Sequence, residues 1–388
     1  MGLDVERARR DTPGCQTVAH LNNAGAALPP SVVTEAVIEH LRWEARIGGY
    51  EAAARAAAAV DKTYTAIARL INCRADEVAV VENATRAWDM AFYSLSFTSG
   101  DRILTSRAEY ASNAIALLQM AQRSGATVEV VDDDEHGQLD VADLARRLDD
   151  TVKLVAITHV PTHGGLVNPA TAIGRLTKAA GVPFLLDACQ SVGQLPIDVK
   201  AIGCDLLSAT GRKYLRGPRG TGFLYVAAEL AEQLQPPFLD LHSARWDAPD
   251  HYSVVPGARR FETWESNVAG KIGLGVAVDY ALGWGLDAIT AQITELAAVL
   301  RRRLSELPGV TVHDHGEALC GIVTFSLDGV PSADVAVQLR AAGVNTSVTT
   351  AANSQFDPLA TEDLVRASVH YYNTPAEIDR LCAALPGN

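Results

Sequence analysis

Apolar strand-like runs alternate with helix-like segments through the first half of the chain, and this order constrains the fold more than any other feature. The runs cover residues 78–81, 102–105, 127–131, 152–158 and 182–186. Apolar strands separated by helices predict a mainly parallel sheet that is covered on both faces. Ligands of such sheets bind at the carboxyl ends of the strands, where we expect Thr85, Thr162 and Asp187.

The strongest local motif is the stretch SATGRKYLRGPRGTGFLY at residues 208–225, in which Lys213 stands between two apolar strand-like runs. A lysine amine can form a Schiff base with a carbonyl cofactor, and an acid at a strand end, such as Asp187, can keep a pyridine nitrogen protonated. Thr210 and Arg212 offer a hydroxyl and a guanidinium to a phosphate group. Together these residues predict pyridoxal 5'-phosphate (PLP) as the cofactor.

Composition excludes several other classes of protein. The net charge of -13 argues against binding to nucleic acid, because a phosphate backbone needs a basic surface. Residues 1–17 lack the apolar core of a signal peptide, and no apolar run is long enough to span a bilayer. The six cysteines are scattered, with no zinc-ligand spacing. We therefore expect a cytoplasmic protein with no resident metal and no membrane partner.

The length of 388 residues allows two domains. The strand–helix alternation becomes less regular after residue 225, helical spacing returns at about 268–307, and strands and helices then alternate again. We predict an α/β protein with an N-terminal arm at 1–20 that joins the small domain, a large PLP-binding domain at 21–285 and a small α+β domain at 286–388.

Several motifs, in the same order, resemble the class V aminotransferase family, a branch of the fold-type I PLP-dependent transferases that includes the cysteine desulfurases. The motifs are LDACQ at 186–190, TGRK at 210–213, GPRGTG at 217–222, THVPT at 158–162 and RAS at 366–368. The resemblance covers the chain from His20 to about Leu385. It implies the fold-type I architecture and a homodimer with sites at the subunit interface.

The resemblance also implies a role for individual residues around the cofactor. Lys213 is the Schiff-base lysine, Asp187 the partner of the pyridine nitrogen and Gln190 the residue that reaches the ring hydroxyl. The expected phosphate ligands are Ala84, through its backbone, Thr85, Thr210 and Arg212. Tyr110 is expected to stack on the ring, although a gapless alignment places Ala111 there.

On the substrate side, the resemblance makes Arg366 the residue that grips the α-carboxylate of an amino acid. We also expect Asn23 to bind substrate, Thr162 to contribute to the cofactor site, and His163 to lie near the substrate as a candidate for proton transfer. His163 is equally open to a purely structural role.

Two departures from the desulfurases bear on the reaction. Desulfurases carry a nucleophilic cysteine on a loop before the carboxylate-binding arginine, and residues 345–357 contain none. Trp264-Glu265 replaces the usual Gly-Thr that reaches the phosphate across the dimer, and a carboxylate there would repel phosphate. Both departures resemble the branch with isopenicillin-N-epimerase-like proteins, the ergothioneine-pathway C–S lyase and PLP enzymes of lincosamide biosynthesis.

We therefore expect an enzyme that acts on an α-amino acid by β-elimination from a cysteine S-conjugate or its sulfoxide, with a place in specialised metabolism. Transamination, epimerisation and decarboxylation coupled to oxidative deamination use the same residues around the cofactor and stay open. A PLP-fold sensor or scaffold without turnover is the alternative outside the enzymes, and intact Lys213, Asp187 and Arg366 argue against it.

Overall fold

A seven-stranded sheet forms the centre of the protein, which is described here by a computed structural model of residues 2–358 and 360–385. Its strand order is β2-β8-β7-β6-β5-β3-β4. The strands are β2 (Val78–Val81), β3 (Arg102–Thr105), β4 (Thr127–Val130), β5 (Val152–Thr158), β6 (Phe184–Asp187), β7 (Leu206–Thr210) and β8 (Gly222–Val226). Strands β4, β3, β5, β6 and β7 run parallel, whereas β8 is antiparallel to both of its neighbours. The predicted mainly parallel sheet is confirmed.

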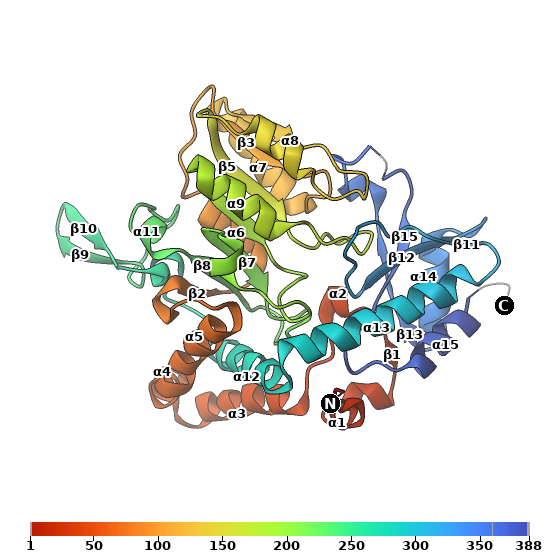
Figure 1. Cartoon of the computed structure of the whole chain (residues 1–388). Helices are drawn as coiled ribbons and strands as arrows, with labels where there is room; N and C mark the ends of the chain where they lie inside the picture. The colour runs from red at the N-terminus through yellow and green to blue at the C-terminus, as the bar shows by residue number, and fades with distance from the viewer. Residues whose placement is uncertain (1, 359, 386–388) are drawn as a thin grey trace.

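Both faces of this sheet are covered by helices (Figure 1). Successive residues of a strand point to opposite faces, and in β6 Leu186 belongs to one buried core while Leu185 belongs to the other. The covering helices are α5 (Ala57–Ile71), α8 (Val141–Arg147), α9 (Ala170–Ala180) and α12 (Val268–Trp284) on the side of Leu186, and α6 (Ala84–Phe92) and α7 (Ala111–Ser124) on the side of Leu185.

The connection between β7 and β8 explains why β8 runs antiparallel. A parallel crossover needs a dozen or more residues, usually with a helix, and residues 211–221 are too few and too rich in glycine and proline for that. The chain therefore turns back at the carboxyl end of β7, and this turn carries Lys213.

A second, antiparallel sheet is built by the C-terminal part of the chain, with the order β11-β12-β15-β14. Its strands are β11 (Val310–Val312), β12 (Ile322–Leu327), β14 (Ser347–Thr349) and β15 (Leu364–Ser368). It shares one core with α13 (Leu286–Ser305), α14 (Ser332–Ala341) and α15 (Pro375–Ala383).

The N-terminal residues pack beside this second sheet. The strand β1 (Ala19–His20) pairs in parallel with β13 (Val344–Asn345), and Ala8 of α1 (Val5–Arg10) belongs to the same core. Helices α12 and α13 meet at Gly285 with a bend of 80°, and no single described helix is long and apolar enough to cross a membrane. The domain boundaries at residues 20 and 285 stay a prediction.

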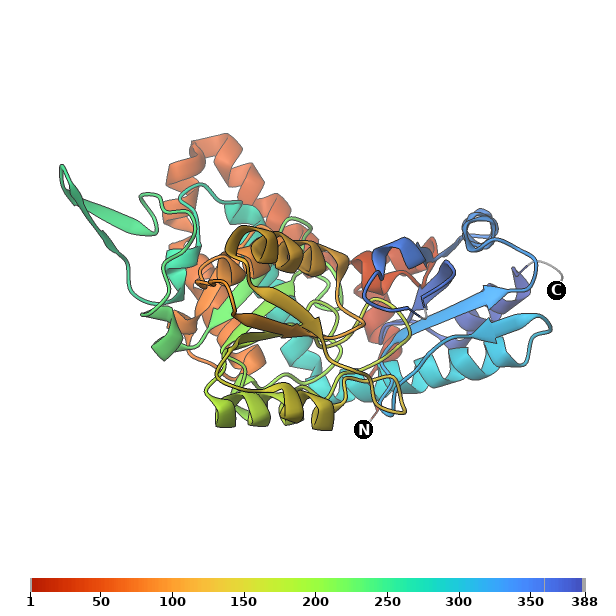
Figure 2. The same cartoon turned by 90° about the horizontal axis from the view of Figure 1, so that it is seen from above.

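The remaining elements lie on the outside of the large sheet. Helix α3 (Ser31–Ile47) runs beside α12, and α4 (Gly49–Arg55) contacts α3 and α5. The hairpin of β9 (Ala244–Ala248) and β10 (His251–Val254) stands out from the body in two perpendicular views (Figures 1 and 2). Three short helices complete the fold: α2 (Asn23–Ala26), α10 (Val199–Ile202) and α11 (Ala228–Ala231).

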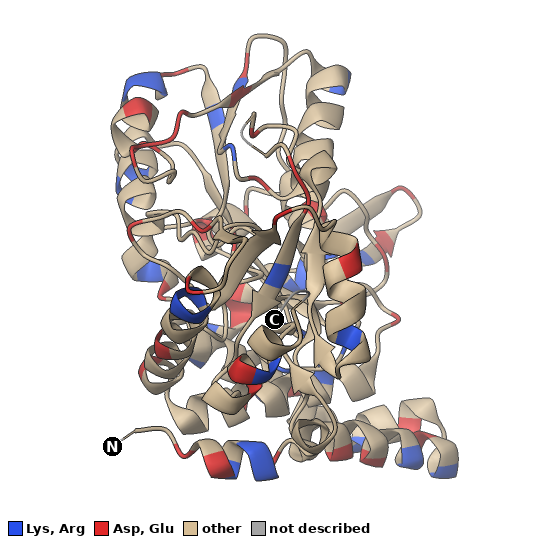
Figure 3. Ribbon diagram, turned by 90° about the vertical axis from the view of Figure 1, so that its right-hand side faces the viewer, with Lys and Arg blue, Asp and Glu red and all other residues tan. Residues whose placement is uncertain are grey.

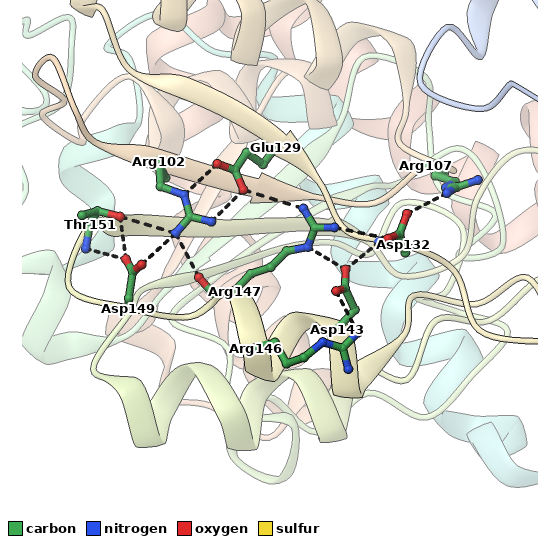
Figure 4. Close-up of polar contacts among 9 residues, drawn as sticks. All are labelled: Arg102, Arg107, Glu129, Asp132, Asp143, Arg146, Arg147, Asp149 and Thr151. Carbon is green, nitrogen blue, oxygen red and sulfur yellow. Dashed lines mark hydrogen bonds and ion pairs between the residues drawn. The ribbon is translucent and has the colours of Figure 1, made fainter.

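Basic and acidic residues are interspersed along the ribbon (Figure 3). The densest polar network ties β3 and β4 to α8 (Figure 4). In it Arg102 donates to Glu129 (2.6 Å) and Asp149 (3.1 Å), and Arg147 donates to Asp143 (2.6 Å). The network is partly buried and links three elements at the edge of the sheet, so we assign it a structural role.

Candidate active site

A cavity of about 500 Å³ opens at the carboxyl ends of β5, β6 and β7. Parallel strands end at the same edge of a sheet, so Thr158, Asp187 and Thr210 meet there although they are far apart in the sequence. All nine residues predicted to bind the cofactor line this cavity: Ala84, Thr85, Tyr110, Thr162, Asp187, Gln190, Thr210, Arg212 and Lys213.

Lys213 and Asp187 are both buried in the cavity wall. Burial, more than any neighbouring charge, lowers the pKa of Lys213 to about 8. The carboxylate of Asp187 accepts hydrogen bonds from Asn113 Nδ2 and from the backbone N–H of Cys189, each at 2.9 Å. The first and last residues of the turn at 211–221 lie close together, so that a Cβ atom on Gly211 would lie 2.3 Å from Thr221 Oγ1. Glycine at this position therefore allows the turn to present Lys213.

The first turn of α6 forms one end of the cavity. Asn83 caps the helix by accepting from Arg86 N at 2.9 Å, and the N–H groups of a first helical turn have no partner within the helix. A Cβ atom on Gly222 would lie 3.0 Å from Ala84 N, so the missing side chain lets β8 begin against this turn. Free amides and a helix N-terminus favour an anion.

Thr210 and Arg212 line the same cavity as this helical turn. Arg212 Nη1 donates to Thr210 Oγ1 at 2.9 Å, and both residues line the cavity together with Ala84 and Thr85. A hydroxyl, a guanidinium and a helix N-terminus form a donor set that suits a phosphate group.

Gln190 provides a direct test of whether the pyridine part of PLP fits. Its Nε2 donates to Ala24 O at 3.1 Å, whereas its buried Oε1 has no hydrogen-bond partner among the described residues. A buried unpaired oxygen is costly unless a ligand supplies a donor. The hydroxyl of the PLP ring is such a donor, so the residues present fit the cofactor.

Tyr110 is the residue of its segment that reaches the cavity. It precedes α7, lines the cavity and is 40% exposed, whereas Ala111 is not part of the lining. Of the two alternatives for the residue that stacks on the ring, the structure places Tyr110 in position. The stacking itself stays a prediction.

Arg366 comes from the second sheet, and the alternation of strand β15 brings it beside the cavity, although it is not one of the lining residues. Its neighbours Val365 and Ala367 lie in the core of that sheet, so the side chain of Arg366 points to the other face. There it donates to Thr162, which lines the cavity, and its Nε donates to Ser347 Oγ at 3.1 Å. The guanidinium thus lies at the edge of the cavity with hydroxyl partners.

His163 and Asn23 do not line the cavity. The ring of His163 bonds to Thr349 and to Ser354 Oγ (Nε2 to Oγ, 2.9 Å), and burial lowers its pKa to about 4. Asn23 is fully buried, where its Nδ2 donates to Ser368 O at 2.7 Å and its Oδ1 accepts from Tyr372. The predicted roles of these two residues in proton transfer and substrate binding therefore rest on the resemblance alone.

Sequence reasoning missed other residues of the site. Asn113 and Thr158 line the cavity, and Glu109 lies buried behind them. One signal was available for Asn113: it follows Tyr110 by three residues at the start of a helix and so lies on the same face. Nothing in the local sequence indicates that Glu109 is buried.

Comparisons with known proteins identify the family of the chain. Residues 18–381 match the model of the family described as aminotransferase class-V. The chain belongs to this family. It is a PLP-dependent enzyme, and the predicted family, fold class and cofactor are confirmed.

The chain is similar over nearly its whole length to proteins named probable cysteine desulfurase. One from Methanothermobacter thermautotrophicus is 32% identical, with 98% of this chain and 96% of the relative covered. One from Xylella fastidiosa is 33% identical, with 98% and 95% covered. The apo structure of a cysteine desulfurase from Thermococcus onnurineus NA1 superposes with a TM-score of 0.91 at 26% identity, covering 99% of this chain and 97% of that one.

Proposed function

We propose that this enzyme is a C–S lyase that eliminates the sulfur substituent from the β-carbon of a cysteine S-conjugate or its sulfoxide, without forming a persulfide on the protein. The names of its relatives support chemistry at the sulfur of cysteine. The observation that carries the proposal is the segment 345–357, which contains no cysteine and is fixed by hydrogen bonds between the ring of His163 and the hydroxyls of Thr349 and Ser354.

The cysteines of the chain do not replace the missing nucleophile. Cys189 is the one cysteine that lines the cavity among the described residues, and its side chain lies beside Asp187. Burial first, and the Asp187 charge second, raise the pKa of the Cys189 thiol well above its usual value. The thiolate is the nucleophile in persulfide formation, and this site disfavours it.

When bound, PLP withdraws electrons from the α-carbon of an amino acid and so weakens the bond to its α-hydrogen. Lys213 holds the cofactor and then accepts the α-proton at Nζ, a task for which a pKa of about 8 suits the amine. The carboxylate of Asp187 would lie beside the ring nitrogen and favour its protonated form. Asn113 and the Cys189 amide hold that carboxylate in place.

Arg366 orients the substrate. Its guanidinium can exchange the hydroxyls of Thr162 and Ser347 for the two oxygens of an α-carboxylate, which form stronger, charge-assisted hydrogen bonds. Burial, the largest influence on Arg366, lowers its pKa because the charge lacks water, and a carboxylate would compensate for that loss.

We further propose that the enzyme is a homodimer whose interface borders the cavity. Glu82 and Gly220 line both the cavity and a smaller hollow next to it. Ser266 lines this hollow and also a groove of about 530 Å³, whose other lining residues include Tyr50 and Trp264. Trp264 is 58% exposed, and neither it nor Glu265 lines the cavity of its own chain. A partner subunit seated on this groove would explain the exposed aromatic side chains.

Product analysis tests the reaction. The holoenzyme is incubated with L-cysteine, with S-alkyl cysteines and with their sulfoxides, and the products are identified by mass spectrometry. Pyruvate and ammonia with release of the sulfur substituent are expected from the S-conjugates. A protein persulfide during turnover with L-cysteine, lost in a single cysteine variant, would refute the proposal. A new amino acid would indicate transamination, and carbon dioxide the decarboxylating alternative.

A further inference from the structure

Two buried carboxylates lie behind the cavity and share one amide. Asn113 Nδ2 donates both to Asp187 Oδ2 and to Glu109 Oε1, each at 2.9 Å. Both Glu109 and Asn113 are buried, with exposed fractions of 5% and 3%. The mechanism described above uses Asp187 directly and leaves Glu109 without a task.

Four hydrogen-bond donors contact the carboxyl group of Glu109. Its Oε1 accepts from Tyr110 N at 2.8 Å, from Asn113 and from Thr158 Oγ1, and its Oε2 accepts from Thr105 Oγ1 at 3.1 Å. Backbone and amide N–H groups can only donate, so Oε1 is an unprotonated acceptor. These donors favour the charged form of Glu109 against the burial that opposes it.

No cation pairs with this charge inside the network that the described residues form. Burial, and to a lesser degree the Asp187 charge, raise the pKa of Glu109 to about 7, against the hydrogen bonds that lower it. Proteins rarely bury a second acid beside a first without a positive partner. Lys213 acts on Asp187 from the cavity wall, and a protonated ring nitrogen would lie next to Asp187 as a further positive charge when the cofactor is bound.

We propose that Glu109 and Asn113 are positioning residues: Asn113 fixes the Asp187 carboxylate toward the ring nitrogen of the cofactor, and Glu109 fixes Asn113 and adds a second negative charge behind it. Glu109 touches neither the cavity nor the substrate. The inference rests on the cofactor and not on the identity of the substrate, so it stands or falls independently of the lyase reaction.

The test follows the protonation of the cofactor itself. The holoenzyme is loaded with PLP that carries ¹⁵N in the ring, and the ¹⁵N NMR signal is recorded against pH without substrate. Other titratable groups near Asp187 are Lys213 and Cys189, so the ring signal and not an activity profile is read. Glu109→Gln keeps an oxygen for Asn113 and removes only the charge, and it should lower the midpoint of ring deprotonation by about one pH unit.

Asn113→Ala removes the amide that joins Glu109 to Asp187, and it is the variant to use if Glu109→Gln does not fold. It should lower the same midpoint and weaken PLP binding by about tenfold, since Asp187 loses one of its two donors. In the double variant the two effects should not add, because both act through one contact. Wild-type midpoints and PLP affinity in both single variants would overturn the proposal.

A matched control is available at the other end of the molecule. Glu377 is also buried and also accepts from an asparagine amide (Asn373 Nδ2, 3.0 Å) and a backbone N–H (Thr374, 3.0 Å); unlike Glu109 it pairs with an arginine (Arg9, 3.1 Å), and it does not line the cavity. Glu377→Gln should lower the melting temperature and leave the ring signal unchanged. An equal shift in the ring signal in this control would show that general destabilisation, and not position, is being measured, and would overturn the proposal.

Discussion

Lys213 shows at the residue scale how burial sets chemistry. It is an amine in a closed wall, 9% exposed, with the pKa lowered to about 8. We expect borohydride to fix the cofactor on Lys213, because burial lowers the pKa of this amine and so raises its neutral, nucleophilic fraction above that of a surface lysine. Peptide mapping of the reduced protein checks this. A reduced adduct on another lysine would contradict the assignment.

The same burial predicts a change in stability of the cofactor-free enzyme. As the pH falls, the unfolded chain binds a proton on Lys213 at about pH 10.5, whereas the folded chain binds it only at about pH 8. Stability is therefore lost as the pH falls through this window and stays lost at pH 7. Lys213→Met should melt a few degrees higher than the wild-type apoenzyme at pH 7, with the difference shrinking toward pH 10. A lower melting temperature at pH 7 would show that Lys213 is better compensated than burial implies.

Asp187 supplies the charge that the ring nitrogen needs. Asp187→Asn keeps the size of the side chain and removes that charge, so turnover should fall by about two orders of magnitude or more while PLP remains bound through the phosphate end. The measurements are steady-state kinetics and PLP affinity on the same preparation. Near wild-type turnover with correctly bound PLP would exclude Asp187 as the partner of the nitrogen.

At the element scale, two segments far apart in the sequence are joined by His163. The ring bonds Thr349 and Ser354, so residues 161–165 hold the segment at 349–358 in place. Burial lowers the pKa of His163 to about 4, so the ring is neutral at pH 7. Between about pH 6.5 and pH 4 the unfolded chain protonates this ring and the folded chain does not, so the folded state loses stability as the pH falls through that range.

His163→Ala should release that segment. We expect faster hydrogen exchange at Ser354, whose N–H donates to Ala351 O at 2.9 Å, and unchanged exchange in the buried strand β6. Mass spectrometry of peptides from both regions makes the comparison within one sample. If the exchange of residues 349–358 were unchanged, the hydrogen bonds to His163 would not be what holds this segment.

Elements differ in how far the sequence predicted them. The parallel strands were predictable because they are mainly apolar runs, and the polar residues at the ends of β6 and β7 located Asp187 and Thr210. Glu109 and Asn113 were not predicted, since their role depends on how α7 packs against β6. Spacing along one segment carries no information about such a contact between elements.

At the scale of the whole molecule, single side chains connect regions that no local pattern relates. Arg216, buried and with a positive φ of 62°, donates to Leu28 O (2.8 Å), Tyr371 Oη (2.6 Å) and Thr12. It thereby ties the turn that carries Lys213 to the N-terminal arm and to the C-terminal segment. The sequence alone presents Arg216 as an ordinary basic residue in a glycine-rich turn.

The apolar surface beside the cavity leads to a prediction about assembly. Tyr50, Leu241 and Trp264 are 75%, 72% and 58% exposed, and Tyr50 and Trp264 line one groove. An exposed apolar surface of this kind on an enzyme in solution is expected to be covered by a partner. We expect light scattering to give twice the chain mass, and Leu241→Asp to weaken the dimer by about tenfold or more because a buried charge would lack a partner.

Val337→Asp is the matched control, because Val337 is 64% exposed on α14, within the C-terminal part of the chain. It introduces the same charge on an exposed aliphatic position and should leave the dimer intact. Since Glu82 and Gly220 border both the cavity and the hollow that leads to the groove, Leu241→Asp should also reduce PLP affinity at concentrations where the dimer dissociates. A wild-type monomer with full PLP affinity at micromolar concentration would show that each site is complete within one chain.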